Sequence, residues 1–131
     1  DGGEIEIWGD GEQTRSFLYI DECVEGTLRL MRSEWTGPVN IGSEEMVSIN
    51  DFARMIADVA GKSLSLRHVE GPTGVRGRNS DNRLIQEKLG WKPSAPLVNG
   101  LRETYCWVEA QVQMAGLQEQ AAPVDARHTT A

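Results

Sequence analysis

The sequence has little of what marks secreted, membrane-spanning or nucleic-acid-binding chains. Its 131 residues include two cysteines, Cys23 and Cys106, too few for a disulfide framework. No stretch approaches the roughly 18 consecutive apolar residues of a membrane span. Acidic residues outnumber basic ones by 20 to 13, giving a formal charge of -7, which argues against binding to nucleic-acid phosphates or anionic membranes. We therefore expect no nucleic-acid partner, no membrane partner and a cytoplasmic location.

Standard catalytic and metal-binding patterns are also missing. The sequence has no glycine-rich dinucleotide fingerprint, no phosphate-binding loop and no serine or cysteine nucleophile motif. The two histidines, His68 and His128, stand apart, with no cysteine or carboxylate at ligand spacing. Tyr19 and Tyr105 both lack a lysine four residues later, so neither forms a Tyr-x-x-x-Lys pair. We predict no catalytic residue, no cofactor-binding residue and no metal ligand in this chain.

The remaining composition is that of an ordinary globular domain. Hydrophobic residues make up 39% and charged residues 25%, and a chain of this length buries a little under about 70% of its unfolded surface. Both cysteines lie in apolar, helix-like runs and are expected to be buried free thiols, although a single bridge between them stays open. The chain begins with Asp-Gly-Gly and has no initiator methionine, so we expect a piece of a longer protein.

Hydrophobic periodicity predicts short strands that alternate with helices. This order indicates an α/β class, with about four helices and too few strands for a complete doubly wound sheet. We predict one domain over residues 1–112 and a disordered, polar tail over 113–131. The expected strands cover residues 4–8, 14–19, 39–42 and 64–69, and the expected helices cover 21–33, 49–60, 81–89 and 99–112. The second helix has clear end signals, a Ser48 and Asp51 capping pair and Gly61 as its left-handed terminator.

Two segments carry the hydrogen-bond donors that a bound anion needs. The first places Gln13, Thr14 and Arg15 directly after a flexible Gly-Asp-Gly turn. In the second, Arg76 and Arg78 bracket a glycine shortly before a predicted helix. A guanidinium group makes bidentate, charge-assisted hydrogen bonds to phosphate oxygens, and glycine allows the backbone to approach closely. The second segment therefore predicts a phosphate site, and the first gives a weaker indication of one.

Each segment also has a simpler interpretation. Arg15 can pair with a nearby acid in a solvated hairpin. Arg76 or Arg78 can form an ion pair with Asp81 or Glu70 and so order the loop. An Arg-Gly tail that binds nucleic acid needs many repeats and a basic context, and the sequence has neither.

Several runs carry a resemblance to a known family. Trp-Gly-Asp-Gly at 8–11, Gln-Thr-Arg-Ser-Phe at 13–17, Ile-Asp-Glu at 20–22 and Pro-Val-Asn-Ile-Gly-Ser at 38–43 resemble the C-terminal part of extended short-chain dehydrogenase/reductases. These are Rossmann-type, NAD-dependent epimerases and dehydratases of nucleotide sugars. Glu-Met-Val-Ser at 45–48, Gly-Val-Arg-Gly-Arg-Asn-Ser-Asp-Asn at 74–82 and Lys-Leu-Gly-Trp at 88–91 are similar to the subfamily of GDP-mannose 3,5-epimerases. The resemblance spans roughly residues 4–112.

The resemblance implies that this chain is the substrate-binding end of such an enzyme. In the family, an N-terminal Rossmann domain holds NAD and a smaller C-terminal domain closes over the nucleotide sugar. The implied reaction oxidises C4 of the mannosyl group, inverts C3 and C5, and then reduces the 4-keto group. The family's substrate-binding positions map onto Gln13, Thr14, Arg15 and Arg78, all on the GDP side. Full-length members are expected to be homodimers.

Two alternatives stay open beside this interpretation. The chain can belong to another extended-family epimerase or dehydratase, although the Gly-Val-Arg-Gly-Arg run argues against it. It can also be a non-catalytic remnant that only binds a ligand or partner.

By resemblance, residues 39–42 form a strand of the Rossmann sheet. We therefore expect the isolated chain to expose apolar surface, to lack NAD and to be inactive.

Overall fold

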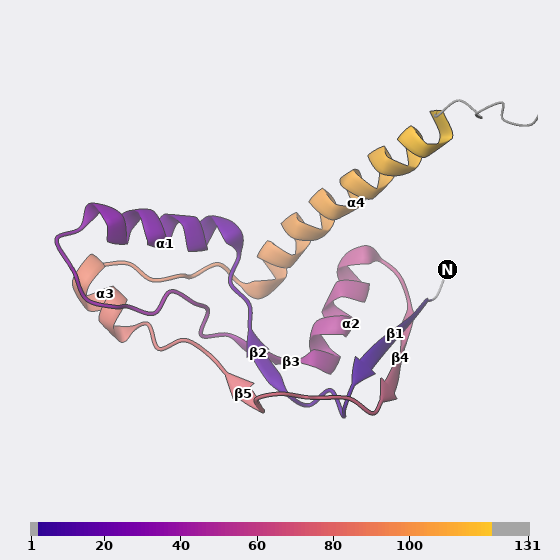
Figure 1. Ribbon diagram of the computed structural model, residues 1–131, viewed down its shortest axis with the longest axis horizontal. Helices are drawn as coiled ribbons and strands as arrows, with labels where there is room; N and C mark the ends of the chain where they lie inside the picture. Colours follow the sequence, from indigo (N-terminus) through magenta and orange to yellow (C-terminus); the bar gives the residue numbers. More distant parts are fainter. Residues whose placement is uncertain (1–2, 122–131) are drawn as a thin grey trace, which may run out of the picture.

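Four helices and five short strands form the part of the chain that the computed structural model describes, residues 3–121 (Figure 1). This mixed α/β arrangement confirms the predicted class. The strands are β1 (Gly3–Trp8), β2 (Thr14–Ser16), β3 (Met46–Ser48), β4 (Leu64–Val69) and β5 (Gly77–Arg78), and the helices are α1 (Ile20–Arg32), α2 (Ile49–Ala60), α3 (Arg83–Leu89) and α4 (Leu97–Ala121).

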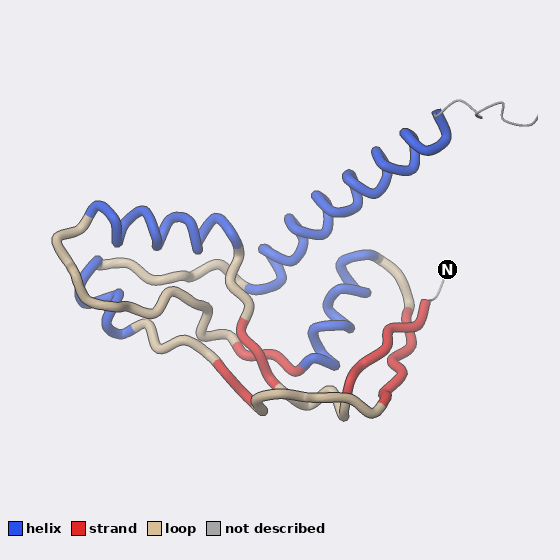
Figure 2. The backbone as a smooth tube through the Cα atoms, viewed as in Figure 1, coloured by secondary structure: helices blue, strands red, loops and turns tan. Residues whose placement is uncertain are grey.

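The strands form two small sheets (Figure 2). In the first sheet, β1 pairs in parallel with β4, from Gly3 opposite Leu64 to Trp8 opposite Val69. In the second, β2 is the central strand, antiparallel to β3 and parallel to β5. Between the sheets, the amide of Thr14 donates to the carbonyl of Arg76 at 2.8 Å. The segment that starts at β1 therefore lies beside the segment that starts at β4 along most of its length.

Helix α2 covers the first sheet and has the ends that the sequence predicts. The Ser48 hydroxyl accepts from the amide of Asp51 at 3.0 Å, and Gly61 ends the helix at φ 62°. Its apolar face buries Ala53 and Ala57, and the helix contacts β1, β4 and α4. Ile7 of β1 is also part of this core, with 4% of its surface exposed.

On the other side of the second sheet, α1 runs along two irregular segments, and α3 lies near the C-terminal end of α1 (Figure 1). Gly26 of α1 is buried because Trp91 and Ile41 lie against it: a Cβ at this position would stand 2.6 Å from Trp91 Cζ3 and 2.9 Å from Ile41 Cγ2. Ile85 of α3 is fully buried. Helix α1 therefore packs onto chain from 41 and 91 rather than onto a sheet of its own.

The strand predicted at 39–42 is wrong for this chain. Its backbone is irregular, since no described strand lies beside it to share backbone hydrogen bonds. The segment instead runs along the chain before α3, where the Asn40 side-chain amide donates to the carbonyl of Asp81 at 3.2 Å. Its apolar character reflects packing on α1.

Two short strands occur where the sequence indicates a helix cap and a loop. β3 lies directly before the cap at Ser48, and β5 lies inside the predicted loop 70–79. Both exist because β2 supplies a partner on each side. The strand predicted at 14–19 ends at Ser16, since the next residues turn toward α1.

Two helices begin at residues other than predicted. Helix α1 starts at Ile20, so Asp21 lies in the first turn and not at the cap, where Tyr19 has no capping side chain. Helix α3 starts at Arg83 because the Asp81 carboxylate accepts from the Arg83 amide at 3.1 Å and holds the chain in a turn before the helix.

Helix α4 is longer at both ends than the predicted 99–112. It continues through Ala121 because residues 113–121 are rich in glutamine, alanine, glutamate and other good helix formers. The first part of the predicted tail, 113–131, is therefore helical, and residues 122–131 lie outside the described residues. The domain boundary at 112 stays a prediction.

No helix between residues 3 and 121 has the length and apolarity to cross a bilayer.

The two cysteines are not paired with each other. Cys23 is half-buried on α1, and Cys106 is exposed on α4, so the predicted burial is wrong for Cys106. This part of α4 extends away from the other elements and has no described neighbour to cover it (Figure 1). Several large apolar side chains are exposed as well: Trp8, Ile20, Val24, Met31, Met46, Val75, Leu84, Val98, Trp107, Val108, Val112 and Met114.

Candidate functional site

Two of the predicted substrate-binding arginines are register partners in the second sheet. Arg15 of β2 lies opposite Arg78 of β5 in the parallel ladder. Neighbouring strands are about 4.8 Å apart, and residues opposite each other project to the same face. The two guanidinium groups therefore start from one face of one small sheet, although the two residues are 63 positions apart in the sequence.

Within residues 3–121, neither of these arginines has a carboxylate partner. Arg15 Nη1 donates to the carbonyl of Thr14 at 2.7 Å, and its Nη2 lies 3.5 Å from the carbonyl of Thr73. Arg78 is exposed and makes no described side-chain hydrogen bond. Asp81, the acid expected to neutralise it, binds Arg83 instead, at 2.5 Å. The simpler interpretation, in which acids neutralise these arginines, is wrong for the described residues.

Gln13 and Thr14 lie at the same place but differ in orientation. Because side chains alternate along a strand, Thr14 projects to the face opposite Arg15. This agrees with the position of its hydroxyl, which would stand 2.9 Å from a Cβ at Gly77. The Gln13 side chain donates to the carbonyl of Trp8 at 3.3 Å, while its buried Oε1 has no described partner. An unpaired buried acceptor is costly, so Gln13 Oε1 has an acceptor position available for a ligand.

The turn before β2 has a tightly defined shape. Gly9 and Gly11 both adopt positive φ, 76° and 71°. A Cβ at Gly9 would overlap Thr73 Cγ2, and one at Gly11 would overlap Asn50 Oδ1. The turn is therefore pressed between the loop after β4 and the first turn of α2, which fixes the start of β2.

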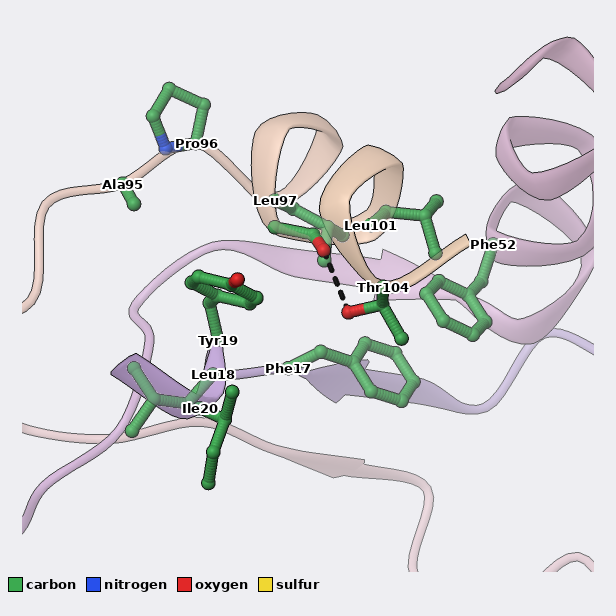
Figure 3. Close-up of a pocket in the computed structure, with 11 residues that line it drawn as sticks. Phe17, Leu18, Tyr19, Ile20, Phe52, Ala95, Pro96, Leu97, Leu101 and Thr104 are labelled. Carbon is green, nitrogen blue, oxygen red and sulfur yellow. Dashed lines mark hydrogen bonds between the residues drawn. The ribbon is translucent and has the colours of Figure 1, made fainter. Parts of the chain in front are cut away.

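An apolar cavity of about 320 Å³ lies where the chain passes from β2 to α1 (Figure 3). The rings of Phe17 and Phe52 stack at 4.0 Å in its wall, and Tyr19 lies against Gly100 in the first turns of α4. The Thr104 hydroxyl donates to the carbonyl of Gly100 at 2.8 Å. No local sequence pattern indicates this cavity, because its walls come from three segments that are far apart in the sequence. Its lining residues are Phe17, Leu18, Tyr19, Ile20, Phe52, Ala95, Pro96, Leu97, Gly100, Leu101 and Thr104.

Two shifted pKa values describe the electrostatics near these regions. Hydrogen bonds from the Arg83 side chain and amide hold the pKa of Asp81 at about 2. Burial raises the pKa of Tyr19, and Asp21 and Glu103 raise it further. A phenol shifted in this direction keeps its proton and is a poor base. Residues 3–121 contain no group of three or more metal-ligating side chains.

Residues 1–42 match the sequence model of the NAD dependent epimerase/dehydratase family. The chain is 59% identical over 109 residues to GDP-mannose 3,5-epimerase of Arabidopsis thaliana, which covers 83% of this chain and 29% of that enzyme. It is 40% identical over 107 residues to dTDP-4-dehydro-6-deoxy-D-allose reductase of Streptomyces bikiniensis, covering 81% of this chain and 32% of that protein.

A solved structure gives the same result at the level of the fold. UDP-glucose 4-epimerase of Thermotoga maritima, solved with UDP-glucose, superposes with a TM-score of 0.78 at 28% identity, covering 83% of this chain and 36% of that one. The chain thus spans about a third of the length of the proteins that it matches. Over most of its own length the chain is similar to the GDP-mannose 3,5-epimerases, and its residues 1–42 match the NAD dependent epimerase/dehydratase family.

Proposed function

We propose that this chain is the nucleotide-sugar-binding end of an NAD-dependent epimerase that acts on GDP-mannose at C3 and C5 through a 4-keto intermediate. The observation that carries the proposal is the pairing of Arg15 with Arg78 on one sheet face without a neutralising acid. Two guanidinium groups on one sheet face, neither of them bound to a described carboxylate, suit the two phosphates of a nucleoside diphosphate. The identity of 59% to the Arabidopsis GDP-mannose 3,5-epimerase supports GDP-mannose as the substrate. The identity to the reductase that acts on another nucleotide sugar is lower, at 40%.

In this proposal Arg15 and Arg78 bind the diphosphate, and Gln13 offers its unpaired Oε1 to a donor of the nucleotide. Thr14 contributes through its backbone, since its side chain projects to the other face. The amide of Thr14 donates to the carbonyl of Arg76 and so holds β5 beside β2. The chain's own task is to bind and orient the substrate.

The residues of this chain do not fit an NAD site. The dinucleotide motif needs a glycine-rich turn that leads from a strand into a helix, whose N-terminus receives the pyrophosphate. Gly9 and Gly11 follow β1, but the turn leads into β2. We assign NAD binding and the acid and base residues to the part of the protein outside this chain. We also assign to that part the strands that residues 39–42 need as neighbours, and the contacts of a homodimer.

Calorimetry on the full-length protein and on this chain tests the proposal. GDP-mannose and GDP should bind the full-length protein with measurable heat, and UDP-glucose should bind at least tenfold more weakly. Equal affinity for UDP-glucose would favour another member of the family. A protein that binds none of the three ligands would contradict a nucleotide-sugar site altogether. Turnover of GDP-mannose by the isolated 131-residue chain would refute the assignment of catalysis to the remainder.

A further inference from the structure

The first turn of α2 contains a buried polar residue that no predicted role explains. Asn50 has 6% of its surface exposed and is one of two buried polar residues in the described part of the chain. It carries no charge, lines none of the described cavities, and lies on a helix whose neighbouring inward residues are alanines. A buried amide is stable only when its donors and acceptor are satisfied, so its partners indicate its role.

Every polar atom of the Asn50 side chain has a partner from another element. Nδ2 donates to the carbonyl of Asp10 at 2.9 Å and to Glu12 Oε1 at 2.8 Å. Oδ1 lies 2.8 Å from His68 Nε2, which must be the donor here because Oδ1 can only accept. The side chain therefore connects β4, through His68, to the turn before β2.

Backbone hydrogen bonds attach the same turn to the same end of α2. The amide of Asn50 donates to the carbonyl of Gly11 at 3.1 Å, and the amide of Ile49 donates to the carbonyl of Gln13 at 3.1 Å. A helix has four amides in its first turn without partners inside the helix. Two of those amides are used here to hold the turn in which Gln13 and the start of β2 lie.

We propose that Asn50 is a positioning residue for nucleotide-sugar binding: through Asp10 and Glu12 it fixes the turn that sets Gln13 and Arg15 beside Arg78. This inference rests on the proposed function. An isosteric carboxylate at position 50 would keep the shape but lose both donors, and it would place an acceptor against the carbonyl of Asp10 and the carboxylate of Glu12. The turn would then shift relative to α2, and with it Gln13 and the start of β2 that carries Arg15.

Steady-state kinetics of the full-length enzyme with GDP-mannose tests the proposal. Asn50→Asp should raise KM about tenfold. It should leave kcat within about twofold, because the proposal assigns the acid and base residues and the NAD site to the part of the protein outside this chain. Amide exchange should increase more at residues 10–13, in the turn before β2, than on α2 itself. Ala57→Gly, two turns along the same helix, is the control for lost stability alone. An equal effect on KM by Ala57→Gly, or an unchanged KM in Asn50→Asp, would overturn the proposal.

The exposed partner provides a second pair of variants that carries little risk of unfolding. Glu12→Ala removes one acceptor of Asn50 and should raise KM about threefold, whereas Glu12→Gln keeps an acceptor oxygen and should retain KM near the wild-type value. A rise in both variants, or in neither, would contradict positioning by the hydrogen bond. Arg78→Ala separates the two claims. If it also leaves KM unchanged, the proposed function fails; if only the position 50 and 12 variants are silent, positioning alone fails.

Discussion

Replacing Arg78 by alanine should weaken binding of GDP-mannose to the full-length protein by roughly tenfold to a hundredfold. In the described part of the chain the Arg78 side chain makes no hydrogen bond and no ion pair, so truncating it costs the free protein no side-chain contact that the structure describes. The loss falls on the complex, where one charge-assisted hydrogen bond contributes about 1.5–3 kcal/mol and each 1.4 kcal/mol is a factor of about ten in affinity. Arg78→Lys should also bind poorly, because an ammonium cannot form the bidentate contact.

Isothermal titration calorimetry with GDP-mannose measures this effect, and the chain offers a matched control. Arg83 is five residues away, and 90% of its side chain is exposed, but its guanidinium is bound to Asp81. Arg83→Ala removes the same charge and should leave the affinity within about twofold. An unchanged Kd in Arg78→Ala, or an equal loss in Arg83→Ala, would refute the argument, because binding would then respond to net charge or not at all.

Three further predictions concern stability and self-association. Gly100→Ala should lower the free energy of unfolding by about 1–2 kcal/mol, because the new Cβ would stand 2.7 Å from Tyr19 Cβ. Gly116→Ala on the same helix has open space and should raise the free energy of unfolding by up to about 1 kcal/mol. Thermal unfolding of both variants checks the opposite signs. The pKa of Asp81 lies at about 2, below its usual 3.8, so the unfolded chain takes up the proton first as the pH drops. The free energy of unfolding therefore falls between about pH 4 and about pH 2. Asp81→Asn should make this loss of stability smaller in urea titrations across that range. The isolated chain should bind a hydrophobic dye and self-associate in sedimentation experiments, because apolar side chains on α1 and α4 are exposed, and a dye-free monomer would contradict this.

Local signals account for the parts of the fold that the sequence predicts well. Ser48 and Gly61 act on the backbone within four residues, so the ends of α2 are readable without knowing the rest of the fold. Alternating polar and apolar residues predict β1 and β4 for the same reason. The choice of Arg15 and Arg78 as candidates also rests on local chemistry, since each lies near a turn with glycine.

Other features depend on partners that are distant in sequence. That Arg15 lies opposite Arg78 follows from a strand pairing, and no local pattern encodes that register. Asn50 was missed because an asparagine in a first helical turn usually faces solvent, and only its contacts with Glu12 and His68 distinguish it. The apolar segment 39–42 has the sequence of a strand but lacks a neighbouring strand among the described residues.

The two parallel ladders have a consequence for how the protein is made. β1 and β2 each pair with a strand about 60 residues later. At a synthesis rate of about 5–20 residues per second, these early strands leave the ribosome roughly 3–12 s before their partners exist. Loop closure over that distance also slows folding relative to local contacts. The nascent chain therefore passes through a period with unpaired strand edges, during which chaperones can bind it and translation speed affects the yield of folded protein.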